Sequence, residues 1–186
     1  MTIRKKTIII TCLTFFILMA LIIAISRIVI SRGFRELETK TVERNVNRVI
    51  QGISEVLSNL SATAADWALW DDTYKFIKEH NEDYVTRNLM YDTLITLKIN
   101  FMLFIDIDNH LVDVRHIDLA NEKATTIPDD LLEKVFFLNN FLKPLRDKNG
   151  KTGIIMVGEM PALVSFKPIL KSDHSGPVRG ILVMGK

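Results

Sequence analysis

The strongest pattern in the chain is an unbroken run of apolar residues close to the amino terminus. Residues 7–26, TIIITCLTFFILMALIIAIS, hold no charged side chain. A helix of that length is about 30 Å long at about 1.5 Å per residue, which matches the hydrocarbon core of a bilayer. The run therefore predicts a membrane-spanning helix, and it argues against a water-soluble single-domain enzyme.

From residue 34 to about residue 68 the apolar residues recur at heptad spacing instead. They are separated by steps of four, three, four, three, four and seven residues: Val42, Val46, Val49, Ile53, Val56, Leu60 and Trp67. Such a seam predicts one long amphipathic helix that continues from the membrane. Two interpretations of the seam stay open. It packs on the domain's own sheet, or its first half pairs with a second copy through Val42, Val46, Val49 and Ile53.

The period changes to two between residues 99 and 117, which predicts two strands joined at Asp108-Asn109. Pro128 and the two acidic residues after it then open a helix that runs to about Asn139. Three more strand candidates follow at residues 152–157, 163–170 and 178–184. The order predicts an α+β fold in which a five-stranded antiparallel sheet with flanking helices follows the long helix.

Charge narrows the function classes. The chain has 24 Lys and Arg against 22 Asp and Glu, a formal net charge of +2, but five of the basic residues flank the apolar run. The remaining domain is mildly acidic and has no basic cluster, so we expect no nucleic-acid partner. The one cysteine, Cys12, lies inside the apolar run. A disulfide within the domain is therefore excluded.

The orientation of the anchor is less constrained, because basic residues lie on both sides of the apolar run. The run exceeds the usual length of a signal-peptide core and no cleavage site follows it, so we expect an uncleaved anchor. A six-residue tail is easily left in the cytoplasm. We therefore expect a single pass through the cytoplasmic membrane, with residues 1–32 as tail and anchor and residues 33–186 as the extracytoplasmic domain. That domain comprises a long helix over residues 33–68 and a core over residues 69–186.

The most unusual stretch is DWALWDDTYKF, residues 66–76, which holds both tryptophans of the chain. On a continuous helix Trp67, Trp70, Asp71 and Tyr74 would share one face. They would form either an aromatic plug on the sheet, with Asp71 or Asp72 capping the next turn, or one wall of a pocket for a cationic or polar small molecule. Arg115, on the second predicted strand, could face this pocket or solvent.

The anchor, the long helix, the W-x-x-W-D-D-x-Y motif and the terminal strand GILVMG (residues 180–185) together resemble the CHASE-type extracellular sensory domains, specifically the fourth CHASE class. The resemblance covers about residues 34–186. It implies a PAS-like or Cache-like fold and a ligand-sensing role outside the cytoplasmic membrane of prokaryotic receptors. Such receptors continue through a second membrane helix into a histidine kinase or a cyclic-di-GMP module. This sequence stops at Lys186, where the second membrane helix would begin. We therefore expect either a fragment of a longer receptor or a truncated open reading frame, in both cases the sensory part without an output module.

Calcium and zinc sites receive little support from the sequence. Asp106-x-Asp108-x-His110 opens like a calcium-binding loop, but Leu111 stands where that loop has glycine and Ile117 where it has glutamate. The four histidines show no zinc spacing. We therefore expect no metal and no cofactor.

The sequence thus predicts a membrane-anchored extracytoplasmic sensor that binds an unknown small molecule and forms a homodimer. The alternative is a PAS-like structural dimerisation module without a ligand. An enzyme that pairs Asp71 with Asp72 is disfavoured, because neighbours on a helix diverge by about 100°, and we expect no catalytic residue. The ligand-binding candidates are Trp67, Trp70, Asp71, Asp72, Tyr74 and Arg115.

Overall fold

A computed structural model describes residues 3–142 and 149–186, with the side chains of residues 28–39 and 141–142 left out. The chain divides into two compact units, Met1–Gly52 and Ile53–Lys186. Helix α1 (Ile3–Ala68) carries both the apolar run and the heptad seam, as the sequence predicted. Within the described residues one segment, Ile3–Arg27, is long and apolar enough to cross a membrane.

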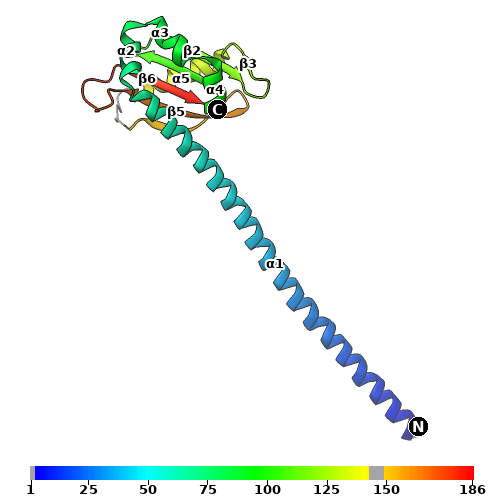
Figure 1. The fold of residues 1–186 in the computed structure, drawn as a ribbon. Helices are drawn as coiled ribbons and strands as arrows, with labels where there is room; N and C mark the ends of the chain where they lie inside the picture. The colour runs from blue at the N-terminus through cyan, green and yellow to red at the C-terminus, as the bar shows by residue number, and fades with distance from the viewer. Residues whose placement is uncertain (1–2, 143–148) are drawn as a thin grey trace. The chain divides into compact units, whose positions relative to one another are not determined.

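The second unit is built on one sheet in which every neighbouring pair of strands is antiparallel. The strand order is β3-β2-β1-β6-β5-β4, so the last strand in sequence lies between β1 and β5 (Figure 1). The strands are β1 (Phe101–Asp106), β2 (Leu111–Asp118), β3 (Lys123–Ala124), β4 (Lys151–Val157), β5 (Met160–Ile169) and β6 (Gly180–Gly185).

The sheet has six strands, where the sequence predicted five. The additional strand is β3, two residues that pair with Ile117 and Asp118 at the end of β2. A two-residue strand is too short to show a period of two, which is why the pattern missed it. The α+β class, the antiparallel sheet and the flanking helices are confirmed.

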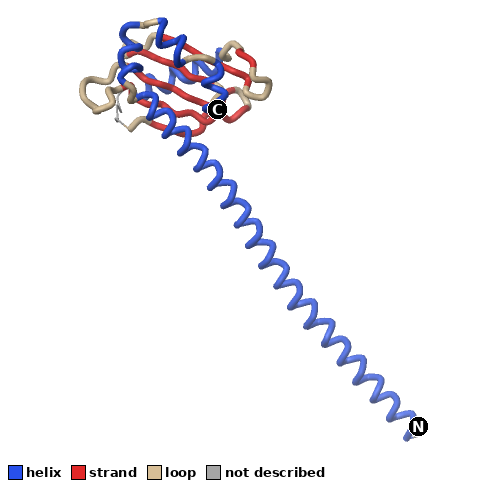
Figure 2. Tube along the Cα trace, viewed as in Figure 1, coloured by secondary structure: helices blue, strands red, loops and turns tan. Residues whose placement is uncertain are grey.

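Within the part of the chain that the structure describes, four shorter helices cover the sheet on its two faces (Figure 2). They are α2 (Asp71–Glu79), α3 (Glu82–Asn88), α4 (Tyr91–Leu97) and α5 (Asp129–Leu142). Helix α5 begins directly after Pro128, as predicted, because proline suits the first turn of a helix and the acidic residues after it favour its positive end.

Strand β1 is buried on both faces, because each face has its own helical layer. Met102 and Phe104 pack with the end of α1 and with α2, α3 and α4. Leu103 and Ile105 pack instead with Leu131 and other residues of α5. The sheet is therefore the middle of three layers, and β1 and β6 lie at the centre of its core.

Two glycines explain the GILVMG sequence of β6. Gly185 pairs with Phe101 on β1, and a Cβ atom at this position would collide with the Phe101 ring. A Cβ atom at Gly180 would collide with the carbonyl oxygen of Ile105 and press on the Ile77 side chain. Both ends of the strand therefore need glycine so that β6 can lie close to β1 and α2.

Candidate functional site

The tryptophan motif does not lie on one helix, which corrects the sequence prediction. Helix α1 ends at Ala68, and Trp70 has an extended backbone (φ −75°, ψ 135°) before α2 begins. The physical reason is a backbone bond from a distant segment. The Leu170 N–H donates to the Ala68 carbonyl at 3.1 Å, so an acceptor that a continuing helix would use is already taken.

The break brings the two indole rings face to face. Trp67 and Trp70 stack with their centroids 4.6 Å apart and their planes 23° from parallel. Trp67 is 8% exposed and belongs to the core, whereas Trp70 is 41% exposed. The motif therefore combines a core tryptophan with one that offers a large part of its ring to solvent.

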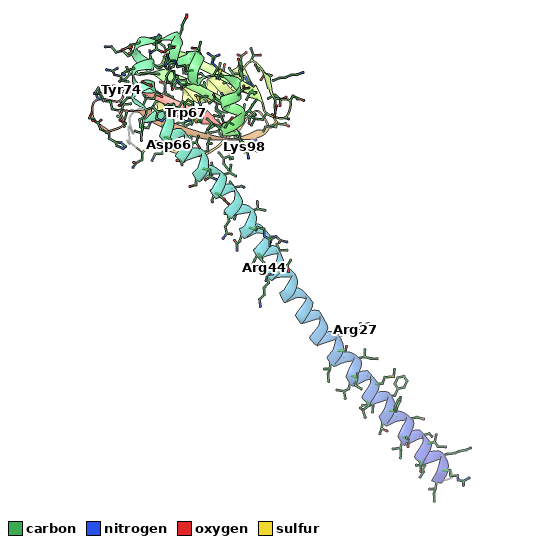
Figure 3. All side chains as sticks on the ribbon, viewed as in Figure 1. Arg27, Arg44, Asp66, Trp67, Tyr74 and Lys98 are labelled. Atoms are coloured by element: carbon green, nitrogen blue, oxygen red, sulfur yellow. The ribbon has the colours of Figure 1, made fainter. Side chains whose placement is uncertain are left out.

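The stacked pair lines a groove of about 480 Å³, which we call the tryptophan groove. Figure 3 shows Asp66 and Trp67 at the end of α1, in its last turn, and both residues line the groove. Among the residues that line the groove, Asp66 is the one with a charged side chain. The lining comprises Thr63, Asp66, Trp67, Leu69, Trp70, Leu97 and Ser172. The groove thus joins the end of α1, the end of α4 and the segment after β5.

Asp71 holds the chain that leads from β5 to β6. Its carboxylate accepts hydrogen bonds from the Ser172 N–H at 3.0 Å and from the Ser172 hydroxyl at 3.1 Å. Residue Trp70 occupies the N-cap position of α2 and makes no side-chain cap bond. The prediction that Asp71 or Asp72 caps this helix is therefore wrong. Asp72 is exposed, with its carboxylate 3.9 Å from the Lys75 ammonium.

Tyr74 holds the same segment, residues 170–179, which we call the β5–β6 loop. The buried Tyr74 hydroxyl donates to the Pro177 carbonyl at 3.1 Å. The Arg179 guanidinium lies 4.1 Å from the centre of the Tyr74 ring, and the Lys171 ammonium lies 5.9 Å from it. The ring is therefore engaged by cations of the chain itself.

Arg115 does not line the tryptophan groove. Its guanidinium makes two bonds to the Asp113 carboxylate on the same strand, at 2.9 Å and 3.2 Å, and both side chains are partly buried. A bidentate pair of this kind satisfies both charges. The structure thus places Trp67 and Trp70 in the groove lining and bonds Asp71 to Ser172 of that lining. Tyr74 and Arg115 lie outside the lining.

A buried polar pair lies in the helical layer over β1. The hydroxyl groups of Thr73 and Tyr84 are 2.6 Å apart, and the Tyr84 ring stacks on Phe76. Burial raises the pKa of Tyr84 to about 12, although the hydrogen bond with Thr73 acts in the opposite direction. The phenol is therefore neutral at physiological pH and serves packing.

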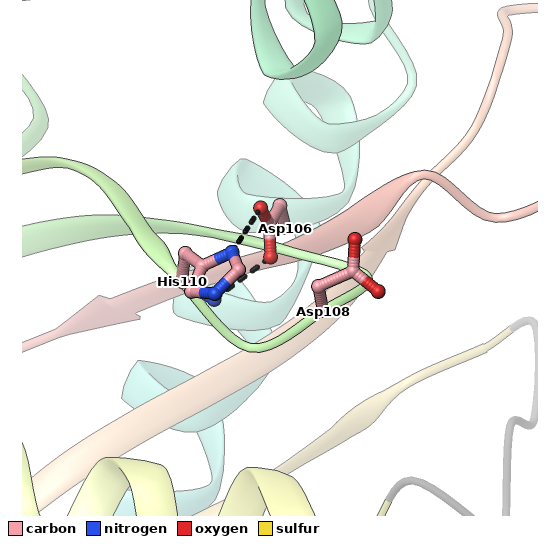
Figure 4. A group of neighbouring side chains, drawn as sticks. All are labelled: Asp106, Asp108 and His110. Atoms are coloured by element: carbon pink, nitrogen blue, oxygen red, sulfur yellow. Dashed lines mark hydrogen bonds and ion pairs between the residues drawn. The ribbon is translucent and has the colours of Figure 1, made fainter.

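The turn between β1 and β2 gathers Asp106, Asp108 and His110, whose side-chain donor atoms lie within 4.8 Å of one another (Figure 4). Asp106 accepts bonds from the His110 N–H at 2.7 Å and from the His110 ring at 3.1 Å. Burial opposes ionisation of Asp106, but the bonds from His110 outweigh it and lower the pKa of this carboxyl. These contacts stabilise a tight turn at Asn109, whose φ is 71°.

Several residues around the motif were not predicted from the sequence. Ser172, Pro177 and Arg179 lie about a hundred positions away from their partners Asp71 and Tyr74. No local pattern links residues at that separation, and the loop sequence indicates only a turn between two strands. Asp66 opens the unusual stretch, but only the fold shows that it faces the groove.

Comparisons with known proteins agree with this architecture. The CHASE4 domain model matches residues 53–186. The methanogenesis regulatory histidine kinase FilI of Methanothrix harundinacea (strain 6Ac) is 30% identical over 151 residues, which cover 81% of this chain and 17% of FilI. The solved extracellular domain of a candidate histidine kinase, vpHK1S-Z8, superposes with a TM-score of 0.60 at 16% identity, over 81% of this chain and 58% of that one, and shows a shared fold. The chain therefore belongs to the CHASE4 family of sensory domains.

Proposed function

We propose that this chain is the sensory part of a membrane-anchored histidine-kinase-type receptor and that it binds a small molecule in the tryptophan groove. The CHASE4 match and the similarity to FilI support a sensory role in signal transduction. The apolar segment Ile3–Arg27 supports anchoring in the cytoplasmic membrane. The observation that carries the ligand proposal is the stacked tryptophan pair, which leaves Trp70 41% exposed along a groove.

The other predicted ligand residues receive supporting roles in this proposal. Asp71 and Tyr74 already bind the β5–β6 loop, and Arg115 is already paired with Asp113. Asp72 lies outside the groove lining. We therefore assign ligand contact to Trp67 and Trp70, and we assign to Asp71 and Tyr74 the positioning of Ser172 and its loop.

The groove lies where three elements of the domain meet, so one ligand would contact all of them. Its lining comes from the end of α1, the end of α4 and the start of the loop that leads into β6. A molecule that contacts all three segments would favour one packing of the end of α1 against the domain core over another. The end of α1 is then the first element to respond to the ligand.

Dimerisation through α1 completes the proposal. Val42, Val46, Val49 and Ile53 are 40% to 61% exposed, although all four are large apolar residues at heptad spacing. A seam of this kind is stabilised when a second helix covers it. The same observation favours the alternative function, a structural dimerisation module that binds no ligand.

Binding to the full chain distinguishes the two functions. The chain is purified in maltoside micelles, and a library of small metabolites is screened for compounds that raise its thermal unfolding temperature. We expect at least one such compound, and we expect Trp70→Ala to abolish its effect while the far-ultraviolet circular dichroism stays unchanged. A library without any stabilising compound, or a compound that stabilises Trp70→Ala equally, favours the module without a ligand.

A further inference from the structure

We infer that the ligand of the tryptophan groove is a small organic cation with an apolar body, bound by the Asp66 carboxylate and the stacked indole rings. This inference rests on the proposed function and names the chemical class of its ligand. It depends on four properties of the groove: the charge of its lining, the direction of its hydrogen bonds, the exposure of its aromatic rings and its volume.

The lining carries one negative charge. Asp66 is the one charged residue among those described around the groove, and Leu69 and Leu97 supply apolar surface. The nearby basic side chain of Lys171 is directed to the Tyr74 ring, with its ammonium 5.9 Å from the ring centre. Asp66 is exposed, and none of the ion pairs found among the described residues involves it, so its carboxylate is available to a cationic ligand.

The hydroxyl groups of the lining offer acceptors. The Thr63 hydroxyl donates its proton to the Asn59 carbonyl at 2.9 Å, and the Ser172 hydroxyl donates to Asp71 at 3.1 Å. Each hydroxyl has one proton, so only its lone pairs remain for a ligand. Together with the carboxylate, these groups favour a ligand that brings donors and positive charge. An anionic ligand would find the indole N–H groups as its main donors.

The indole pair is suited to hold a cation. Tryptophan has the most favourable ring for cation–π contact, and the rings are stacked at 4.6 Å with Trp70 41% exposed. The third aromatic residue of the motif, Tyr74, already has the Arg179 guanidinium 4.1 Å from its ring centre. The motif thus contains one aromatic site filled by the chain and one, at Trp70, that is open to a ligand.

The groove has room for a small molecule. A groove of about 480 Å³ falls in the lower part of the range of about 300–1,000 Å³ that is usual for small-molecule sites. Quaternary ammonium compounds and aryl-alkyl amines fit this volume. Their charge would lie beside Asp66 and their apolar body along the indole and leucine surface.

The test uses matched pairs of charged and neutral probes. Choline is compared with its uncharged isostere 3,3-dimethylbutan-1-ol, and 2-phenylethylamine with 2-phenylethanol. The full chain is kept in maltoside micelles, which contain no choline headgroup. Both tryptophans of the chain line the groove, so fluorescence excited at a wavelength selective for indole reports on this site alone.

We expect at least one of the two cations to bind at least tenfold more tightly than its neutral partner, with an affinity that falls as salt rises. Asp66→Asn keeps the shape of the side chain and should weaken the cation about threefold to tenfold without changing the neutral probe. Asp72→Asn is the matched control, because Asp72 is an exposed carboxylate outside the lining. It should leave every affinity unchanged.

Three results would overturn the inference. Equal affinity for charged and neutral probes would contradict selectivity for a cation, although the proposal of a small-molecule site would still stand. The absence of saturable binding by either cation would reject the ligand class, and the metabolite screen would still decide whether any ligand binds. Equal weakening by Asp66→Asn and Asp72→Asn would show that the general field of the domain attracts the cation, without a contact at Asp66.

Discussion

At the scale of single residues, the W-x-x-W-D-D-x-Y motif contains two pairs of residues with different contacts. Trp67 and Trp70 line the groove, whereas Asp71 and Tyr74 fix the β5–β6 loop beside it. The loop needs these contacts because it is exposed along most of its length and includes Gly176 with φ of 80°. In the proposed function, Asp71 positions Ser172 of the groove lining, and Tyr74 fixes the same loop at Pro177.

Hydrogen exchange at the Ser172 amide tests the role of Asp71. Asp71→Ala removes both exposed bonds to Ser172 and should lower the free energy of unfolding by about 1 kcal/mol, the usual net contribution of an intramolecular hydrogen bond. Hydrogen exchange should become faster at the Ser172 amide, which donates to Asp71. Asp72→Ala is the control and should leave exchange in residues 170–179 unchanged. Equal effects of the two variants would contradict the assigned role.

Tyr84 gives a pH dependence with a definite sign. Burial raises its pKa from the ordinary value of 10.0 to about 12 in the folded domain. The folded state therefore keeps the phenol proton that the unfolded chain loses, so this contribution to stability is complete below pH 10 and is lost as the pH rises through 12. We expect the free energy of unfolding to fall across that interval.

Tyr84→Phe isolates this effect from the titration of other groups. The variant lacks the ionisable group and should show a smaller fall in stability across the same pH interval, although it also loses the bond to Thr73 and starts from a lower value. The ultraviolet absorbance of tyrosinate should show a late-ionising component that is missing from Tyr84→Phe. Identical pH slopes for the two proteins would contradict the burial of this phenol.

At the scale of elements, the sequence predicted the segments with a clear period and missed the features that depend on distant contacts. The long helix and the strands β1, β2, β4, β5 and β6 were predictable because their apolar residues repeat over many positions. The break between Ala68 and Asp71 was not, because a backbone bond from Leu170 defines it. Helices α3 and α4 have seven residues each, about two turns, which is too short for a clear period.

The heptad seam of α1 has two parts that differ in burial. Its last members, Leu60 and Trp67, belong to the core of the domain, which confirms that this part packs on the domain itself. Its earlier members, Val42, Val46 and Val49, are at least half exposed. Pairing of that part with a second copy stays a prediction, and it can be tested by cross-linking.

We expect Val46→Cys and Val49→Cys, each in a Cys12→Ser background, to form disulfide-linked dimers rapidly in membranes under mild oxidation. Residues on a heptad seam of a parallel pair face their own counterparts, which brings the two sulfur atoms into range. Arg44→Cys and Asn47→Cys are controls on other faces of the same exposed helix. Cross-linking at equal rates around the helix would reject the seam.

At the scale of the whole molecule, the proposed function requires the CHASE4 domain to lie outside the cytoplasmic membrane. Alkaline phosphatase, which folds only where disulfides form, should be active when fused after Lys186. A fluorescent protein that matures in the cytoplasm should be dark at the same point. The control is the same pair of fusions on a chain that lacks Ile3–Arg27, the apolar segment. Without that segment the activities should exchange, because nothing else among the described residues is apolar enough to cross a bilayer. Phosphatase activity that does not depend on the segment, or fluorescence from the intact chain, would place the groove on the cytoplasmic side and remove the case for an external ligand.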